Sequence, residues 1–446
     1  MTPRQTSFSD DQLETLQRLT FDYFLKEANP QNGLVPDSTR QGSPCSITAT
    51  GFALAAYPVG VERTFITRKD AIKRTLTTLR FFWHSAHGPE PDATGYKGFY
   101  YHFLDMTTGR RTWDSELSTI DSTFLLAGAL TAAEYFNRDT EAEREIRTLA
   151  NDIYARADWQ WAQNRGVTVT HGWRPETGFI KYRWQGYNEA LLLYVLGLAS
   201  PTHPLPAKSY RAWTRTYKWK KLYDREFLYA GPLFIHQLSH MWIDFAGIQD
   251  AYMRKRGIDY FENSRRATLI QQQYAIRNPR GFEGYGEYIW GLTASDGPGP
   301  SSRRISGKLR RFYDYKGRAV PNGPDDGTLA PWAVIASLPF APEIVLPSLQ
   351  YFDKAFPGMT SKYGFKCSFN PTFSGPSGKD RGPRAGSPAG AVGWISKGYY
   401  GLDQGPIVLM IENYKSGLLW RLMRGCSYIR DGLRRAGFSG SWLKAR

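Results

Sequence analysis

The feature that most constrains the fold is a succession of apolar patterns with helical spacing, separated by long loops rich in glycine, proline and aromatic residues. Apolar residues recur every three or four positions, which is the period of a helix with one buried face. Strict alternation is scarce, and the β-favouring pieces "GFYYHFLD" and "TVTHGW" are short. The predicted helices, about twelve in number, cover residues 9–28, 46–57, 64–84, 116–136, 139–164, 187–199, 207–217, 231–254, 264–276, 328–338, 342–354 and 404–424.

No repeat of fixed period is visible, so these helices do not indicate a solenoid. We expect an all-α chain that forms a closed double ring of helices, with alternate helices in the inner wall and an active site built by the loops at one end. The motifs are dispersed over nearly the whole chain, so we expect a single domain over residues 1–446. Residues 277–327 form a long irregular stretch, and its aromatic residues favour a functional loop.

Composition and charge restrict the ligand. Aromatic residues make up 15% of the chain, which suits a protein that stacks planar side chains on carbohydrate or single-stranded nucleic acid. The formal net charge of +16 is compatible with anionic partners. Basic residues concentrate at 211–221, at 301–311 and at the C-terminal end. None of these segments is a recognised nucleic-acid module, so we expect solvated basic faces and no nucleic-acid partner.

The sequence also bears on location. No stretch reaches about 18 consecutive apolar residues, so no membrane-spanning helix is expected. The N-terminal segment lacks the apolar core of a secretion signal. Two locations are therefore open: the cytoplasm, or the periplasm or exterior if a signal was removed before this numbering.

One carboxylate has an unusual sequence context. Glu189 lies in "YRWQGYNEALLLYVLGLASP", residues 182–201, where we expect the first turn of a helix with a broad apolar face. The helix dipole favours a carboxylate there, so a helix-start acid is the simpler interpretation. The functional interpretation depends on its neighbours, which would form an aromatic rim suited to a sugar ring. These neighbours are Tyr182, Trp184 and Tyr187, with Arg183 and Asn188 as hydrogen-bonding groups.

Five blocks of the chain now point to a family. In order, they are "GFYYHFLDMTTGRRTWDSELSTIDSTFLLAGAL", "HGWRPETGFIKYRWQGYNEALLLYVLGLASP", "PLFIHQLSHMWIDFAGIQD", "GFEGYGEYIWGLTASDGPG" and "GLDQGPIVLMIENYKSGLLW". Together they resemble the glucoamylase-like family that includes the endo-β-1,2-glucanases of glycoside hydrolase family 144. The similarity runs from about residue 12 to 424, followed by a basic extension over 425–446. The resemblance implies an (α/α)6 toroid, no metal or other cofactor, and cleavage of a β-glucan, with linear or cyclic β-1,2-glucan as the best-established substrate class.

Such chemistry needs two carboxyl groups across the scissile bond. Glu189 matches the family's "GYNEA" block and is the expected general acid, provided that burial raises its pKa against the helix dipole. Three segments compete for the base, in order of preference "WDSELSTIDS" with Glu116 and Asp121, "GLDQGP" with Asp403, and "GYGEYIWGL" with Glu287. Helix capping is the simpler interpretation of the first two segments.

The remaining candidates are binding residues. His236 and His240 have the spacing of a zinc pair, but Gln237 stands where a zincin needs Glu, so no metal site is expected. We expect these histidines to bind sugar hydroxyls beside Trp242 and Asp244. The other residues predicted to line subsites or bind hydroxyls are Trp113, Trp173, Trp290, Asp296, Gln404 and Tyr414.

One departure from the family pattern keeps alternatives open. Relatives often carry an acid near "YGF..AFN", whereas this chain has Cys367 and Ser368 in "YGFKCSFN". A transglycosylase, or an exo-acting enzyme on another glucan linkage, is therefore the alternative within the fold. From a different class, the alternative is a non-catalytic binder of anionic glucans, in which the carboxylates are only structural.

Overall fold

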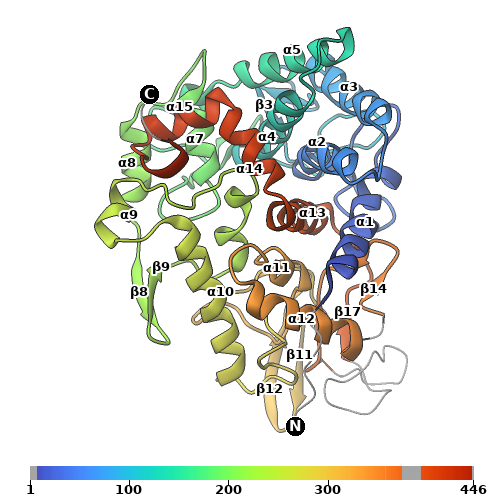
Figure 1. Cartoon of the computed structure of the whole chain (residues 1–446), viewed down its shortest axis with the longest axis vertical. Helices are drawn as coiled ribbons and strands as arrows, with labels where there is room; N and C mark the ends of the chain where they lie inside the picture. Colours follow the sequence, from blue (N-terminus) through green and yellow to red (C-terminus); the bar gives the residue numbers. More distant parts are fainter. Residues whose placement is uncertain (1–7, 357, 374–392, 444–446) are drawn as a thin grey trace.

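The computed structural model describes residues 8–356, 358–373 and 393–443. Within these residues the molecule consists mostly of helices, as Figure 1 shows. The α-helices are α1 (Asp10–Lys26), α2 (Ile47–Glu62), α3 (Arg68–His84), α4 (Thr119–Tyr135), α5 (Glu141–Ala155), α6 (Trp159–Ala162), α7 (Leu191–Ala199), α8 (Lys208–Thr214), α9 (Ala251–Arg256), α10 (Tyr260–Arg277), α11 (Pro331–Ile335), α12 (Pro342–Ala355), α13 (Gly401–Lys415), α14 (Leu418–Gly425) and α15 (Ser427–Arg435). Three short 3-10 helices are η1 (Leu233–His236), η2 (Leu238–Met241) and η3 (Ser441–Leu443).

The helices are of two kinds. Helices α2, α4, α7 and α13 are buried along nearly their whole length, because most of their residues are apolar or small, although α13 also buries Asp403, Gln404 and Glu412. Helices α3, α5 and α10 bury one face and expose charged residues on the other. We expected an all-α chain, and its mostly helical character is confirmed, although short strands accompany the helices.

The inner helices pack closely enough to exclude side chains. Helices α2 and α4 meet at two glycines, and a Cβ on Gly128 would lie 2.0 Å from the carbonyl oxygen of Gly51. Helix α13 contacts α1, α2 and α11 and lies near the centre of Figure 1. In the first turn of α2, Thr48 donates a hydrogen bond of 2.6 Å to Asp121 in the first turn of α4. The two inner helices therefore begin at the same end of the molecule.

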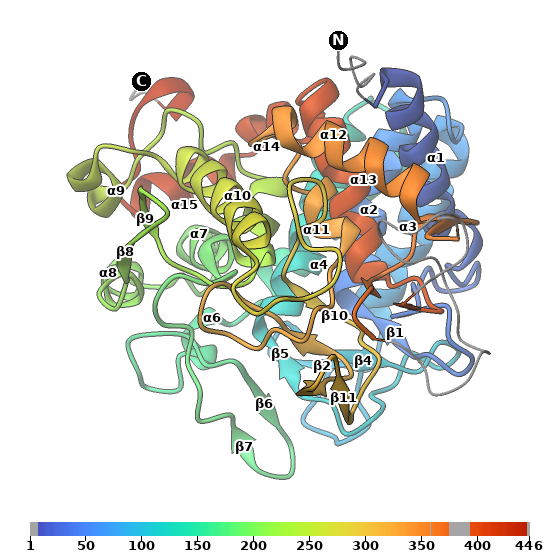
Figure 2. The same ribbon diagram turned by 90° about the horizontal axis from the view of Figure 1, so that it is seen from below.

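Short strands gather largely at that end (Figure 2). The largest sheet is antiparallel with the order β2-β3-β5-β6-β7, and the other sheets have two strands. The piece "GFYYHFLD" forms β3 and β4, as expected. The strands are β1 (Cys45–Ser46), β2 (Gly95–Tyr96), β3 (Phe99–Tyr101), β4 (Phe103–Leu104), β5 (Leu117–Ser118), β6 (Gly172–Arg174), β7 (Gly178–Phe179), β8 (Trp219–Leu222), β9 (Arg225–Leu228), β10 (Ala294–Ser295), β11 (Ser301–Ile305), β12 (Lys308–Phe312), β13 (Lys316–Gly317), β14 (Thr360–Ser361), β15 (Gly364–Phe365), β16 (Phe369–Asn370) and β17 (Trp394–Ile395).

Three predicted helices are divided in the structure, and the segment 139–164 forms α5 and α6. The segment 231–254 forms η1, η2 and α9 in place of one continuous helix. Buried side chains of this segment form hydrogen bonds with residues far away in the sequence. Gln237, for example, donates to the carbonyl oxygen of Ala333 and to Ser337. The segment 404–424 is divided into α13 and α14 at Gly417, whose φ of 68° is left-handed and ends a helical run. Helix α15, in the basic extension, was not predicted.

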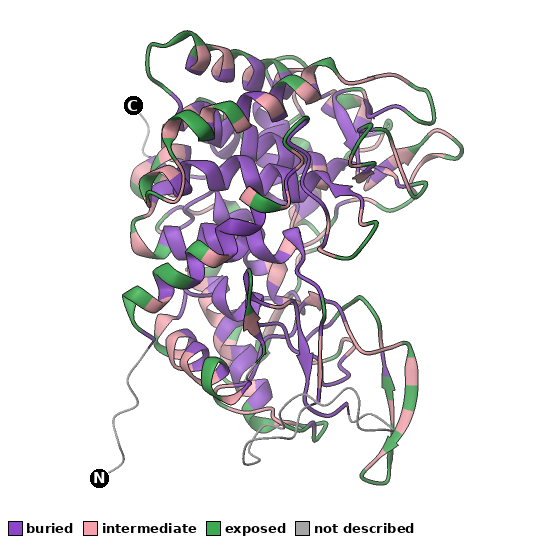
Figure 3. Ribbon diagram, turned by 90° about the vertical axis from the view of Figure 1, so that its right-hand side faces the viewer, coloured by how far each residue is buried: buried purple, intermediate pink, exposed green. Residues whose placement is uncertain are grey.

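One hydrophobic cluster joins the two ends of the described chain, since it includes both Phe8 and Leu443. Figure 3 shows the buried residues concentrated in the inner helices and the exposed residues on the outer helices and loops. Among the described residues, no helix is long and apolar enough to cross a bilayer.

Candidate active site

A pocket of about 440 Å³ lies beside the starts of β4 and α13. One wall is aromatic and the other carries charged and hydroxyl groups, which is the kind of surface that binds sugars. The lining residues are Asp37, Ser38, Arg40, Gln41, Gly42, Ser43, His102, Phe103, Trp113, Tyr315, Tyr400 and Leu402.

His102 bridges the two carboxylates that the sequence placed first as candidate bases. Its Nδ1 lies 3.2 Å from Oε1 of Glu116, and its Nε2 lies 3.5 Å from Oδ1 of Asp121. The imidazole stacks on Phe103 with ring centroids 4.0 Å apart. Burial acts to lower the pKa of His102, but the negative charges of Asp121 and Glu116 raise it to about 9. His102 is therefore a cation at neutral pH.

The positive charge of His102 acts on the pKa of Glu116. Burial acts to raise the pKa of Glu116, but the hydrogen bond and charge of His102 lower it below the usual value. Asp121 also accepts from Thr48 and from Ser118, the N-cap of α4. The capping role in this segment thus falls to Ser118, and the carboxylates of Glu116 and Asp121 face a histidine cation.

Glu189 lies two residues before α7, which begins at Leu191, so its expected place in the first helical turn was wrong. The Ala190 N–H, just before α7, donates its hydrogen bond to the side chain of Asn188 and not to the carboxylate of Glu189. The Glu189 carboxyl forms no ion pair or hydrogen bond with another residue in the described part of the chain. Burial raises its pKa to about 7, its own backbone N–H acts in the opposite direction, and the charge of Asp121 raises it further. Half-buried Glu189 therefore keeps a proton near neutral pH.

A second group of acids lies around the start of α13. Asp403 is 1% exposed, its Oδ2 has no hydrogen-bond partner among the described residues, and burial raises its pKa well above the usual value. Asp296 pairs with Arg40 at 2.6 Å and accepts from Ser396. Burial raises the pKa of Asp37 to about 6. Asp403 is thus a neutral acid, which is poorly suited to accept a proton from water.

Among the predicted aromatic residues, Trp113 lines the pocket and is 63% exposed. Trp184 is mostly buried, stacks on His171 at 3.9 Å and donates to Thr119. Trp173 belongs to β6 and packs on neighbouring aromatic residues. Tyr187 is half-buried in an aromatic cluster. Of these side chains, Trp113 has the geometry of a platform for a sugar ring.

Several predicted binding residues lie in the core instead. Trp242 and Trp290 are 0% exposed, because Trp242 packs between inner-helix aromatics and Trp290 donates to Ser348. His236 and His240 are each 1% exposed. The described residues contain no group of three possible metal ligands.

The hydrogen bonds of these histidines and of Asp244 are internal. His236 Nε2 contacts the Ala230 carbonyl oxygen, and His240 Nε2 contacts Ser264. Asp244 is 4% exposed and pairs with Arg424. A core location of all three residues corrects the prediction that they bind sugar hydroxyls.

The other predicted residues have structural or peripheral positions. Arg183 donates to the carbonyl oxygens of Gln163 and Thr168, and so closes a loop. Asn188 accepts from the Trp213 indole as well as from Ala190. Gln404 is 0% exposed within α13. The exposed residues away from the pocket lining are Tyr182, Tyr414 and Glu287.

Of the lining residues given above, only Trp113 was predicted; the unpredicted ones include Asp37, Arg40, His102 and Tyr315. His102 lies between β3 and β4 in a piece quoted only for its β propensity, and a lone polar residue among aromatics was the available signal. Asp37 and Arg40 belong to a loop near the N-terminal side of α2, where no local pattern predicts a ligand. Their place in the site follows from long-range contacts such as the bridge between Ser38 and Tyr400.

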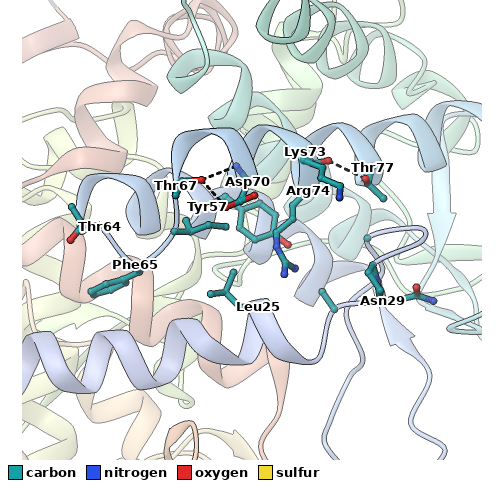
Figure 4. Close-up of a pocket in the computed structure, with 14 residues that line it drawn as sticks. Leu25, Asn29, Tyr57, Thr64, Phe65, Thr67, Asp70, Lys73, Arg74 and Thr77 are labelled. Atoms are coloured by element: carbon teal, nitrogen blue, oxygen red, sulfur yellow. Dashed lines mark hydrogen bonds between the residues drawn. The ribbon is translucent and has the colours of Figure 1, made fainter.

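A larger pocket of about 500 Å³ lies between α1 and α3 (Figure 4). Its lining includes Tyr57, Lys73 and Arg74 but has one acid, Asp70, which accepts from Thr67 at the start of α3. The lining of the smaller pocket also has one acid, Asp37, but its His102 contacts the two carboxylates of Glu116 and Asp121, the kind of pair that glycoside cleavage needs. The smaller pocket is therefore the candidate active site.

Comparison with known proteins gives a consistent result. The family model Glycoamylase matches residues 181–427. An exo β-1,2-glucooligosaccharide sophorohydrolase (non-reducing end) of Parabacteroides distasonis is 28% identical over 463 residues, covering 96% of this chain and 58% of the relative. This chain thus spans little more than half the length of that curated relative.

Two crystal structures are similar throughout. A Bacteroides uniformis protein with a glucoamylase designation has a TM-score of 0.83 and 31% identity, with 99% of this chain and 100% of that chain covered. The endo-β-1,2-glucanase of Chitinophaga pinensis, in complex with sophorotriose and glucose, has a TM-score of 0.82 and 26% identity, with 97% and 99% covered.

In this chain a helical scaffold has inner helices that begin beside a pocket lined by aromatic and polar residues, and its solved neighbours include proteins with a glucoamylase designation. The five sequence blocks predicted this class. The chain belongs to the glycoamylase family.

Proposed function

We propose that this protein is a glycoside hydrolase that cleaves a β-1,2-glucan, with Glu189 as the general acid. The observation that carries the proposal is the contrast between a protonated and an ionised carboxyl group. Burial raises the pKa of Glu189 to about 7, while the hydrogen bond and charge of His102 lower the pKa of Glu116. Pairs of acids whose environments push their pKa values apart are the usual acid and base of such enzymes.

In the proposed reaction Glu189 donates its proton to the glycosidic oxygen as that bond breaks. Asp121 or Glu116, each in contact with His102, removes a proton from the water that attacks the anomeric carbon. Asp121 is favoured, because it is the carboxylate whose charge acts on Glu189. Trp113 provides a stacking surface for a glucose ring at the pocket rim.

The substrate class rests on the relatives. One is named for releasing sophorose units from β-1,2-glucooligosaccharides, and another is an endo-β-1,2-glucanase seen with sophorotriose and glucose. We further propose that the fold is an (α/α)6 toroid in a single domain, in line with the alternation of inner and outer helices.

The test is reducing-sugar release from a panel of linear and cyclic β-1,2-, β-1,3-, β-1,4- and β-1,6-glucans. We expect release from β-1,2-glucan by the wild type, and product analysis then separates sophorose release from a mixture of longer oligosaccharides. A folded wild-type protein that binds β-1,2-glucan but releases no sugar would favour the non-catalytic binder instead.

A further inference from the structure

The hairpin formed by β11 and β12 carries a strong local charge. Residues 301–316 contain six Lys or Arg residues and one acid, Asp314. We propose that this hairpin binds acidic groups attached to the glucan, so that the preferred substrate is an anionically substituted β-glucan. This inference rests on the proposed function, because it assigns the substrate class of the same site.

The strand register divides the hairpin into two faces. Arg303 pairs with Arg310, and Ser301 pairs with Phe312, so these residues lie on one face. The pair Arg304 and Leu309 lies on the opposite face, as does the pair Ser302 and Arg311. Because side chains alternate along a strand, the two sets have different surroundings.

The first face anchors the hairpin. Phe312 is 0% exposed and its ring lies 4.9 Å from that of Phe373. The guanidinium of Arg310 lies 4.5 Å from the centre of the Phe282 ring and donates to the carbonyl oxygen of Gly281 at 2.7 Å. These contacts hold the hairpin on the protein body.

The second face is free for a ligand. Ser302, Arg304, Leu309 and Arg311 are all exposed, and Leu309 is 72% exposed. Lys308 pairs with Ile305 and so belongs to the first face by register, but it is exposed next to the turn. In the described chain, Arg304, Lys308 and Arg311 form no ion pair, so their charges act on the solvent. A cluster of uncompensated cations attracts anions.

The hairpin is continuous with the candidate active site. Asp296, which pairs with the pocket residue Arg40, precedes Ser301 by five residues, a reach of at most ~17 Å. After β12 the chain continues to Tyr315, which lines the pocket. Figure 2 places β11 at the same end as β2, β4 and β10. This continuity favours an acidic saccharide over an unrelated polyanion such as nucleic acid.

The test compares a neutral linear β-1,2-glucan with the same glucan partly esterified with succinate. Binding of each is measured by calorimetry, and turnover of each is measured by sugar release. We expect the wild type to bind the succinylated glucan at least about fivefold more tightly at low salt. The difference should disappear at high salt, because exposed charges are screened.

The hairpin variant is Arg304→Gln/Lys308→Gln/Arg311→Gln. A control with the same charge change replaces exposed lysines on other elements, Lys69→Gln/Lys208→Gln/Lys255→Gln. We expect the hairpin variant to lose the preference while its neutral-glucan turnover stays within about twofold, and we expect the control to keep the preference. Equal melting temperatures show that both variants are folded.

Two results would overturn the inference: equal binding of both glucans by the wild type, or an unchanged preference in the hairpin variant. Preferred binding of single-stranded DNA by the hairpin, with no glucan preference, would also overturn it. Failure of the proposed hydrolase function can be told apart from failure of this inference. If the protein is no hydrolase, it does not turn over the neutral glucan, but the ratio of the two binding constants still tests whether the hairpin binds acidic groups.

Discussion

The substitution Glu189→Gln separates a catalytic acid from a structural one. The amide keeps the shape of the protonated carboxyl but cannot donate its proton to a leaving group. General acid catalysis typically contributes about 10²- to 10⁴-fold, so we expect turnover of β-1,2-glucan to fall at least by that order, with oligosaccharide binding retained.

The pH dependence of stability provides a second readout, and its magnitude follows from the structure. The pKa of Glu189 is about 7 in the folded protein, against 4.5 for the free side chain. Folding is therefore favoured by the proton: the contribution is complete below pH 4.5 and is lost as the pH rises through 7. The full shift corresponds to roughly 3 kcal/mol, an upper value because the side chain keeps some contact with water.

The assay is thermal unfolding and initial rate on wild type and Glu189→Gln between pH 5 and pH 9. We expect the variant to melt higher than the wild type at pH 8.5, with the gap closing at pH 5. The wild-type rate should fall as the pH rises above 7, when Glu189 ionises. If Glu189 were only an acid at the start of a helix, Glu189→Gln would lower the stability by about 0.3–1 kcal/mol and leave the rate nearly unchanged. That result would contradict the catalytic role.

Four further outcomes are expected. His102→Gln should move the acidic limb of the rate profile upward by about one pH unit or more, because the cation that lowers the pKa of Glu116 is lost; an unchanged profile would contradict this. Asp403→Asn should keep most of the turnover and melt higher at alkaline pH, since the buried acid is neutral in the folded state. Trp113→Ala should raise KM about twofold to tenfold with an unchanged melting temperature, as expected for loss of a stacking surface. Chelation should leave turnover unchanged, and a loss restored by zinc or calcium would refute the metal-free mechanism.

The inner helices could be predicted from the sequence because their apolar residues carry a local signal. The start of α1 was also predictable, since Ser9 and Gln12 form a capping box. The structure of the segment 231–254 could not be predicted in this way, because the spacing of its apolar residues is that of a helix. Its backbone conformation depends on residues about 100 positions away, as the hydrogen bond from Gln237 to Ser337 shows. Local sequence propensity does not include contacts with residues so far away in the chain.

The active site was predictable in part for the same reason. Glu189, Glu116 and Asp121 stand in segments with recognisable helix starts or family motifs. Asp37 and His102 do not, and they join the pocket through strand pairing and loop contacts between distant segments. The fully buried Trp242 and Trp290 show the converse error, since an aromatic residue in a motif block packs in the core as readily as in a subsite.

The position of Glu189 explains how one site can hold both protonated and ionised acids. Had α7 begun two residues earlier, the carboxyl would have met free backbone N–H groups, which stabilise its charged form. The side chain of Asn188 instead bonds the Ala190 N–H, and the carboxyl is left in a half-buried setting with Asp121 as a nearby charge. Asp121 is in turn held beside the His102 cation. One histidine therefore contacts the carboxylate whose charge helps to raise the pKa of Glu189.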